Sequence, residues 1–377
     1  MNLGQKFKNK TFLITGASGF IAGRIIERLC RDYDCPIKAL VHNIGHAARI
    51  ARFNIEIIPG DILDKKLLEK TTQNVDYVIH CAVGNTPDIK LNHQITVSGT
   101  KNILGASLKN KVKRLIYFST MSVYGYPLPL RINEKTPYKK VTGDHYNNDK
   151  IDAEKICRKY IKEGLPVVIL QPTIVYGPYA KSWTLGPINE IKDNRVFLVD
   201  NGQGIANPVY IDNLIDAVFL SLTKKQAIGK TFIISNGKGI TWKNFYSAYQ
   251  KMISSEQPAL PKFSLFNQYK LKILSLPVVL PIKLFLKIKK FYNPLKLFKT
   301  QPAFLKQVIT PLYQKSQSIK NLSADKNRQL FFQDKALFKI KKVEKILSYS
   351  PRISFSQGMK LTEKWLKYAR HLTQTKI

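Results

Sequence analysis

Tyr146 and Lys150 have the spacing of a tyrosine and a lysine that could share one proton-transfer site. They are the first and last residues of the stretch Tyr146-Asn147-Asn148-Asp149-Lys150, at the start of an expected helix. Residues four positions apart lie on the same helix face. A free tyrosine has a pKa of about 10, and a nearby cation lowers that pKa by stabilising the phenolate. Tyr146 is therefore a candidate general acid and base. Lys150 is the candidate cation and could also bind the ribose of a cofactor.

Thr120 offers a hydroxyl that could orient a reacting oxygen beside Tyr146. It belongs to the stretch Ser119-Thr120-Met121-Ser122, which ends the apolar run 115–119. A hydroxyl at the end of a buried strand can hold the oxygen of a carbonyl or an alcohol. The alternative is a hydroxyl that only caps a strand or a helix, and this alternative stays open, more so for Ser122 than for Thr120.

A glycine-rich turn near the N-terminus has the pattern of a phosphate-binding site. The residues are Gly16-Ala17-Ser18-Gly19-Phe20-Ile21-Ala22, between a strand-like run and a helix-like run. Glycines let the backbone turn tightly and approach a diphosphate, and the N-terminus of the following helix offers free N–H groups and a positive dipole. Placed after the first strand of a β-α-β unit, the pattern indicates a dinucleotide cofactor.

The residues after the second expected strand bear on which dinucleotide binds. An acidic residue there would bind a ribose 2′-hydroxyl and favour NAD, but the chain reads Val41-His42-Asn43. His42, Arg49 and Arg52 could instead meet a 2′-phosphate, which favours NADP slightly over NAD. Alternatively, the two arginines are solvated helix residues.

The elements that must position these residues alternate between strands and helices. Short continuous apolar runs predict buried strands, at 11–15, 37–41, 55–58, 75–80, 115–119 and 166–170. Helical spacing falls at 20–29, 64–71, 96–108 and 150–163. This order predicts an α/β fold, a doubly wound parallel sheet of Rossmann type, with ligands at the carboxyl ends of the strands. We expect a cofactor-binding domain over 1–178. We expect 179–377 to be mostly a smaller substrate lobe, interleaved with late elements of the sheet domain.

The ordered motifs resemble the extended short-chain dehydrogenase/reductases, also called NAD-dependent epimerase/dehydratases. The matching stretches are TGASGFIA (15–22), GDILD (60–64), DYVIHCAV (76–83), VSGTKNIL (97–104), VKRLIYFSTMSVYG (112–125), YNNDKIDAEK (146–155), QPTIVYGP (171–178), VYIDNLIDA (209–217) and SYSPRISFSQGMKLTEKWL (348–366).

The resemblance assigns roles to further residues. It implies that Thr120 is the catalytic hydroxyl and that Pro172 lies beside the nicotinamide. It implies further cofactor contacts at the ends of two strands: Asp61 and Ile62 at the adenine, with Cys81, Ala82 and Val83 lining the cofactor. A homodimer is also an expectation from the resemblance.

Two positions depart from the family pattern in the part that holds the substrate. Ile174 stands where the family commonly has an asparagine that binds a sugar nucleotide, and Ala206-Asn207-Pro208 stands where an arginine is usual. Both changes remove polar partners for a sugar or a diphosphate, and a site without such partners discriminates poorly for polar groups.

Three functions therefore remain. The first is an epimerase or dehydratase acting on a sugar nucleotide or a related carbinol by hydride transfer, with Tyr146 as general acid and base. The second is an NADP-dependent dehydrogenase or reductase of an apolar alcohol or ketone, such as a hydroxysteroid-like or isoprenoid-like substrate, which Ile174 and the apolar segment 270–290 favour. The third is a non-catalytic scaffold that binds the cofactor, against which the intact Thr120, Tyr146 and Lys150 argue.

The charge of the chain suggests an anionic partner or a lysine-rich surface. The formal net charge is +36 over 377 residues, yet no zinc-finger spacing or aromatic RNA-binding pattern accompanies it, so we expect no nucleic acid. The apolar, lysine-rich segment 264–300 is too short and too rich in proline to span a bilayer. Residues 270–300 could instead contact the inner face of an anionic membrane, or pack over the substrate.

The four cysteines predict a reduced, intracellular protein. They lie without metal-ligand spacing, at Cys30, Cys35, Cys81 and Cys157, and such sparse cysteine is typical of a reducing compartment. Met1–Lys10 is polar and basic and has no apolar signal region. We therefore expect a cytoplasmic enzyme without a metal.

Overall fold

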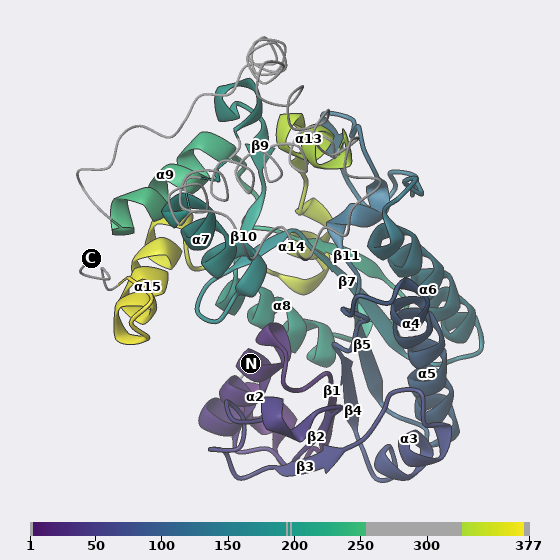
Figure 1. Cartoon of the computed structure of the whole chain (residues 1–377). Coiled ribbons are helices and arrows are strands. Elements are labelled where there is room, and N and C mark those ends of the chain that lie inside the picture. The colour runs from purple at the N-terminus through teal and green to yellow at the C-terminus, as the bar shows by residue number, and fades with distance from the viewer. Residues whose placement is uncertain (1–2, 194, 197, 254–325, 373–377) are drawn as a thin grey trace, which may run out of the picture. The chain divides into compact units, whose positions relative to one another are not determined.

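A seven-stranded parallel sheet forms the centre of the fold (Figure 1). The structure is a computed structural model, and it describes residues 3–193, 195–196, 198–253 and 326–372. The strand order is β11-β7-β5-β4-β1-β2-β3, and every pair of neighbours is parallel. The strands are β1 (Phe12–Thr15), β2 (Ile37–Val41), β3 (Glu56–Pro59), β4 (Tyr77–His80), β5 (Arg114–Phe118), β7 (Val167–Pro172) and β11 (Thr231–Ile234).

The predicted doubly wound sheet is confirmed. Every residue of β1, β5, β7 and β11 is buried, as expected for strands covered by helices on both faces. The six strands predicted from apolar runs all form, and β11 extends the sheet beyond β7. The order reverses at β1, between β4 and β2, and this is the place where ligands bind in such sheets.

Helices cover the two faces of the sheet. On one face lie α3 (Lys65–Thr71), α5 (Gly99–Lys109) and α6 (His145–Lys162), which pack side by side. On the other lie α2 (Phe20–Tyr33) and α8 (Ile211–Thr223), with the short α1 (Leu3–Phe7) against both. The C-terminus of α8 receives the buried Arg114 guanidinium, whose Nη1 donates to the carbonyl oxygens of Ser221 at 2.8 Å and Lys224 at 3.0 Å. A cation at a helix C-terminus is favourable.

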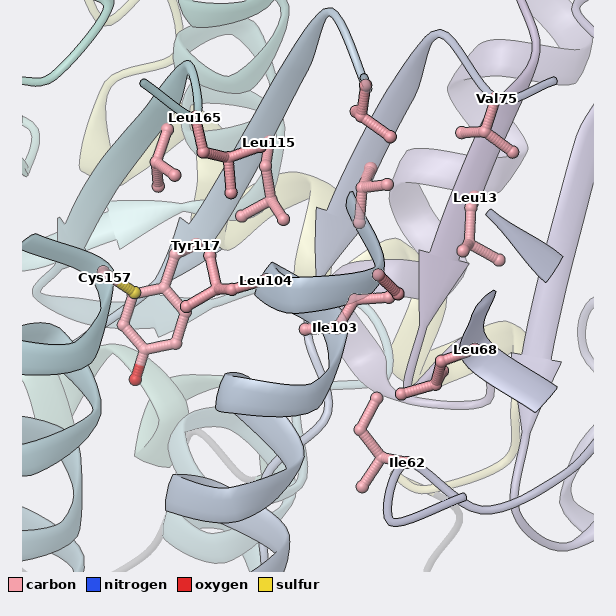
Figure 2. Packing of buried hydrophobic residues seen from close by; sticks show 14 of the residues in the cluster. Leu13, Ile62, Leu68, Val75, Ile103, Leu104, Leu115, Tyr117, Cys157 and Leu165 are labelled. Atoms are coloured by element: carbon pink, nitrogen blue, oxygen red, sulfur yellow. The ribbon is translucent and has the colours of Figure 1, made fainter. Parts of the chain in front are cut away.

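A hydrophobic core cluster lies between the sheet and α3, α5 and α6. Figure 2 shows Leu13, Leu115 and Tyr117 of the strands facing Leu104 of α5 and Cys157 of α6. All five side chains are at most 1% exposed. At about 25 cal/mol per Å² of apolar surface, such burial is the main favourable term in folding. This packing fixes α5 and α6 against the strand ends that carry the candidate site.

Further strands and helices complete the described part of the chain. The remaining strands are β6 (Arg131–Ile132), β8 (Ile174–Tyr176), β9 (Ile205–Ala206), β10 (Pro208–Tyr210), β12 (Ile240–Thr241) and β13 (Leu337–Phe338). The remaining helices within the described residues are α4 (Ile89–His93), α7 (Gly186–Lys192), α9 (Trp242–Ile253), α13 (Lys326–Gln333), α14 (Lys341–Leu347) and α15 (Phe355–Tyr368). Single turns of 3₁₀ helix are η1 (Ile44–His46), η3 (Met121–Tyr124), η5 (Val199–Gly202) and η6 (Lys225–Ala227); π turns are η2 (Gln94–Ser98) and η4 (Lys181–Leu185).

The chain forms two compact units. One comprises Met1–Ile188, Ala206–Ile240 and Ala336–Ile377, and it contains the whole sheet. The other comprises Asn189–Ile205 and Thr241–Lys335. An aromatic cluster around Trp242, which includes Phe245, Tyr246 and Phe332, packs the second unit. The boundary at residue 178 between cofactor and substrate parts stays a prediction.

The basic segment 264–300, including the proposed membrane contact at 270–300, lies outside the described residues. Within the described part of the chain, no helix has both the length and the apolar character needed to cross a bilayer.

Candidate active site

The glycine-rich turn lies against the end of β4. Gly16 has φ +63°, and a Cβ there would lie 2.8 Å from both Cα and N of Ala82, so only glycine fits this position. The Gly19 amide donates to the Gly16 carbonyl oxygen at 2.9 Å and closes the turn. Without a side chain at Gly16, a ligand could approach the backbone of the turn closely.

The N-terminus of α2 completes a cradle for an anion. Gly19 is the N-cap and supplies no side-chain hydrogen bond to the first turn, and the first amides of a helix have no partner within it. The first turn begins at Phe20 and Ile21, directly after Ser18 and Gly19. This arrangement fits the diphosphate of a dinucleotide, which would be held by backbone amides and the helix dipole.

His80 ties β1 and β4 to α5 through a directional chain of hydrogen bonds. Its Nδ1 lies 2.7 Å from Thr15 Oγ1, its Nε2 lies 3.0 Å from Thr100 Oγ1, and Thr100 Oγ1 donates to the Thr96 carbonyl oxygen at 2.5 Å. Since the Thr100 proton is used on Thr96, Nε2 of His80 must donate and Nδ1 must accept from Thr15.

The imidazole of His80 is therefore neutral. Burial lowers the pKa of His80 to about 3, and the charge of Lys150 acts in the same direction. The Ala82 amide also donates to Thr15 Oγ1, at 3.4 Å. Sequence reasoning missed His80, although a histidine within a buried strand next to the glycine turn signals a polar partner there.

The ends of β2 and β3 bring His42 and Asp61 together. His42 Nδ1 lies 3.8 Å from Asp61 Oδ2, and the two side chains are 82% and 44% exposed. Asp61 Oδ1 also accepts from the Leu63 amide at 2.9 Å. Ile62 is buried under Gly99, where a Cβ would lie 2.7 Å from Ile62 Cγ2. The His42 and Asp61 side chains are thus exposed to a ligand, whereas the Ile62 side chain is packed against Gly99.

Arg49 is neither solvated nor available to a 2′-phosphate. Its side chain is 14% exposed and lies 3.6 Å from Glu27. Nη1 donates to the Phe20 carbonyl oxygen at 3.2 Å, and the guanidinium lies 4.0 Å from the centre of the Tyr179 ring. Arg52 is 54% exposed and lies 3.6 Å from the same glutamate. Both arginines are thus engaged by Glu27, which the sequence reasoning did not foresee.

Cys81, Ala82 and Val83 follow β4 beside the glycine turn. The Cys81 amide donates to the Thr15 carbonyl oxygen at 3.2 Å, and all three residues are partly buried. Burial raises the pKa of the Cys81 thiol to about 12, against the effect of the Lys150 charge. The Cys81 side chain is therefore a neutral thiol beside the glycine turn.

The start of α6 is fixed on both sides of Tyr146. Asp144 caps the helix by accepting from the Asn147 amide at 2.9 Å. The Asn147 side-chain amide donates to the Ser122 carbonyl oxygen, and the Asn148 side chain exchanges two 3.1 Å hydrogen bonds with the Val141 backbone. The helix consequently begins at His145, five residues before the predicted start at Lys150.

Tyr146 is a partly exposed side chain beside Thr120. The Tyr146 side chain is 47% exposed. Burial of its phenol raises the pKa of Tyr146, and hydrogen bonding with the Thr120 side chain acts to lower it. Thr120 Oγ1 also caps η3, accepting from the Ser122 amide at 3.2 Å. The capping alternative therefore holds for Thr120 as well, alongside its contact with Tyr146.

Lys150 is buried and donates from Nζ to the Phe118 carbonyl oxygen at 2.8 Å. Its ammonium also lies 5.1 Å from the centre of the Tyr117 ring. Burial lowers the pKa of Lys150 to about 8, while Cys81, Cys157 and Glu154 act to raise it. The expected lowering of the Tyr146 pKa is wrong for this structure, because burial outweighs other contributions and Lys150 is engaged with Phe118 instead.

The side chains of Ile174 and Asn207, at the two positions that depart from the family pattern, are both buried. Pro172 ends β7, and Ile174 in β8 is 2% exposed. Asn207 is buried as well: its Nδ2 donates to the Ala336 carbonyl oxygen at 2.9 Å and its Oδ1 accepts from the Phe338 amide at 3.3 Å. Asn207 is therefore a structural residue and does not replace the missing arginine.

A family model matches residues 13–265 of this chain; its description is 3-beta hydroxysteroid dehydrogenase/isomerase family. The chain belongs to this family. It is thus an extended short-chain dehydrogenase/reductase, of the group of NAD-dependent epimerases and dehydratases, which are NAD(P)-dependent enzymes.

Two relatives of this family member are epimerases. An N-acetyl-α-D-glucosaminyl-diphospho-ditrans,octacis-undecaprenol 4-epimerase of Escherichia coli O157:H7 is 27% identical over 220 residues, 56% of this chain and 62% of that protein. A UDP-glucose 4-epimerase of Vibrio cholerae is 26% identical over 251 residues, 64% of this chain and 75% of that protein. This chain thus matches less than two thirds of the length of the first of these two relatives.

A solved structure shares the fold of this family member. It is a dTDP-glucose 4,6-dehydratase from Streptomyces venezuelae with NAD bound, which is 18% identical, with a TM-score of 0.70 over 96% of this chain and 98% of that chain. At this identity the likeness shows the fold alone.

Proposed function

We propose that the chain catalyses hydride transfer at a carbinol carbon of a sugar carried on a diphosphate, in an epimerase or dehydratase type of reaction. The observation that carries the proposal is the contact of Tyr146 with Thr120 just beyond β5, whose last carbonyl oxygen, that of Phe118, accepts from the buried Lys150 ammonium. The epimerase relatives support this reaction type.

The residues present fit an NAD(P) cofactor. Gly16, Gly19 and the first turn of α2 would hold its diphosphate, Asp61 and Ile62 would lie at the adenine, and Pro172 would lie near the nicotinamide. When bound, the nicotinamide supplies the acceptor and donor of hydride. NAD and NADP both remain candidates, because Arg49 is engaged by Glu27, while the exposed His42 and Arg52 side chains could still meet a 2′-phosphate.

Tyr146 would take the proton of the substrate hydroxyl and return it, as general base and then general acid. Thr120 would donate to the same oxygen and hold it beside the phenol. Lys150 would contribute positive charge beneath the phenolate and bind the cofactor ribose. A phenol whose pKa burial has raised needs such stabilisation before it can act as a base at neutral pH.

The experiment separates bound from exchangeable cofactor. Denaturing the purified protein and identifying released dinucleotide by mass spectrometry should show bound NAD⁺ or NADH, since an epimerase or dehydratase reoxidises its cofactor within one turnover. Tyr146→Phe should abolish turnover of sugar diphosphates while dinucleotide binding stays within about threefold. A Tyr146→Phe protein with full turnover contradicts the proposal, and binding without any turnover in the parent favours a scaffold.

A second candidate is a reductase of an apolar alcohol or ketone. The specific observations are the hydroxysteroid dehydrogenase family match and the apolar Ile174, with no polar side chain at that position. An empty protein that consumes added NADPH with apolar ketones, in stoichiometric amounts, would favour this reaction over epimerisation.

A further inference from the structure

One buried polar cluster ties together three elements that carry candidate site residues. It consists of Tyr124 at the end of η3, Tyr138 in the loop before α6, Glu154 and Arg158 in α6, and Gln171 in β7. Tyr124 donates to Gln171 Oε1 at 2.6 Å. Gln171 Nε2 in turn donates to Glu154 Oε1 at 2.8 Å and to the Tyr138 hydroxyl at 2.7 Å. We call these five residues the Glu154 cluster.

Both carboxylate oxygens of Glu154 are satisfied. Its Oε2 accepts from the Tyr138 hydroxyl at 2.6 Å and from Arg158 Nη2 at 3.1 Å, and Arg158 also donates to the Tyr138 oxygen at 2.7 Å. Glu154 and Gln171 are 0% exposed. A buried charge persists only when it is paired and hydrogen bonded, and losing one partner leaves the others unpaired.

The cluster reaches each candidate site residue through the backbone. Tyr124 closes the turn that Thr120 opens. Gln171 immediately precedes Pro172 in β7, and Glu154 lies one helical turn after Lys150 on the same face of α6. The hydrogen bonds of the cluster therefore fix η3, β7 and α6 relative to one another, and with them Thr120, Pro172 and Lys150.

Glu154 is also the one carboxylate among the groups that act on the Lys150 ammonium in the described structure. The others are the thiols of Cys81 and Cys157, whose pKa values burial raises, and the neutral imidazole of His80. The thiols and the imidazole carry no charge near neutral pH. Glu154 is accordingly the acidic side chain that acts to raise the Lys150 pKa, one helical turn away in α6.

From this geometry we infer that Glu154 and Gln171 are positioning residues, which hold Thr120, Lys150 and Pro172 in register and place the Glu154 carboxyl one helical turn from the Lys150 ammonium. The inference rests on the proposed function for its effect on catalysis. Its electrostatic part holds for the protein itself, whatever the substrate.

The first test compares Glu154→Gln with two other variants. Asp152→Asn is the matched control, because Asp152 lies in α6 but pairs on the outer surface with Lys140 at 2.7 Å and Lys155 at 3.1 Å. The double variant Glu154→Gln with Gln171→Glu moves the carboxylate to β7 and keeps one carboxylate facing one amide. Thermal unfolding reports folding in each case.

For turnover, we expect Glu154→Gln to lower kcat by about tenfold or more with little change in KM. The alkaline limb of kcat should move to lower pH, because loss of a negative charge lowers the Lys150 pKa. The double variant should recover most of kcat, and Asp152→Asn should match the parent. Unchanged kcat and pH profile in folded Glu154→Gln, or a loss of stability alone, would overturn the inference.

A measurement without substrate separates this inference from the proposed function. The difference in unfolding free energy between each protein and its Lys150→Met counterpart changes with pH across the Lys150 titration. That change should begin at lower pH in Glu154→Gln than in the parent, and at the same pH in Asp152→Asn. An unshifted Lys150 titration in Glu154→Gln refutes the electrostatic role. If the titration does shift in Glu154→Gln but the parent protein turns over no carbinol, only the proposed function is refuted.

Discussion

Lys150 Nζ donates to the Phe118 carbonyl oxygen at 2.8 Å, and this bond joins helix α6 to the end of β5. Lys150 is 5% exposed, so its charge is held inside the fold by a carbonyl and by the ring of Tyr117. A carbonyl dipole compensates a buried charge only in part. For this reason burial of the Lys150 ammonium lowers the stability of the folded protein, and this cost can be measured.

The Lys150 ammonium should make stability depend on pH in the alkaline range. Its pKa is lowered from 10.5 to about 8 by burial. Below pH 8 both folded and unfolded chains hold the proton, and the full cost of burial is present. Between about 8 and 10.5 only the unfolded chain holds it, so stability rises with pH relative to a chain without Lys150, by up to about 1.4 kcal/mol per pH unit.

Denaturant unfolding of the parent and of Lys150→Met, at intervals from pH 7 to 10.5, measures this contribution. The stability advantage of Lys150→Met should be largest at pH 7 and should shrink above pH 8. A constant difference over the whole range would show that Lys150 titrates normally.

Gly16→Ala should cost both stability and cofactor binding. The substitution places a Cβ in the left-handed region, at φ +63°, and 2.8 Å from the Ala82 backbone. Strain and overpacking together should cost about 2–5 kcal/mol, and displacement of the turn should weaken dinucleotide binding. Gly164→Ala is the control, since Gly164 has φ +94° with nothing within 4 Å, and should cost only about 1–2 kcal/mol. Thermal unfolding and dinucleotide titration compare the two; equal losses would argue against the clash.

Most of the sheet could be predicted from the sequence because parallel strands buried on both faces are continuous apolar runs. Phe12–Thr15, Ile37–Val41 and Arg114–Phe118 match predicted strands to within one residue. Contacts between distant residues have no such signal. The two-residue pairing of β6 with β13 joins Arg131 to Leu337, and no local pattern marks either strand.

Within the site, residue types were predicted better than their environments. The glycine turn and Thr120 follow from their places at strand ends, and Tyr146 follows from its place at the start of a helix. The start of α6 was missed, because Asp144 and Asn148 fix it through capping and a loop contact. The direction of the Tyr146 pKa was wrong, because burial is a property of the folded chain and has no signature in a four-residue spacing.

His42, and not Arg49, should influence the choice between NADH and NADPH. Arg49 is engaged by Glu27, the Phe20 carbonyl oxygen and the Tyr179 ring, so Arg49→Ala should weaken both dinucleotides equally by loosening the glycine turn. The His42 side chain is 82% exposed at the end of β2. Fluorescence titration should show that His42→Ala lowers affinity for NADPH more than for NADH. A changed ratio in Arg49→Ala alone would reverse the assignment.

Thr15→Val should destabilise the protein by breaking the chain of hydrogen bonds through His80. Thr15 Oγ1 donates to His80 Nδ1 at 2.7 Å and accepts from the Ala82 amide at 3.4 Å. Valine has nearly the same shape but leaves a buried imidazole nitrogen without its donor, which costs about 1–3 kcal/mol. Thr223→Val is the control, because the Thr223 hydroxyl bonds only the carbonyl oxygens of the preceding helical turn, at 3.1 and 3.2 Å. Denaturant unfolding should show a clear loss for Thr15→Val and a change within about 0.5 kcal/mol for Thr223→Val. If the two variants were equally stable, the hydrogen bond to His80 would contribute nothing net, and the neutral tautomer of His80 would need another source of support.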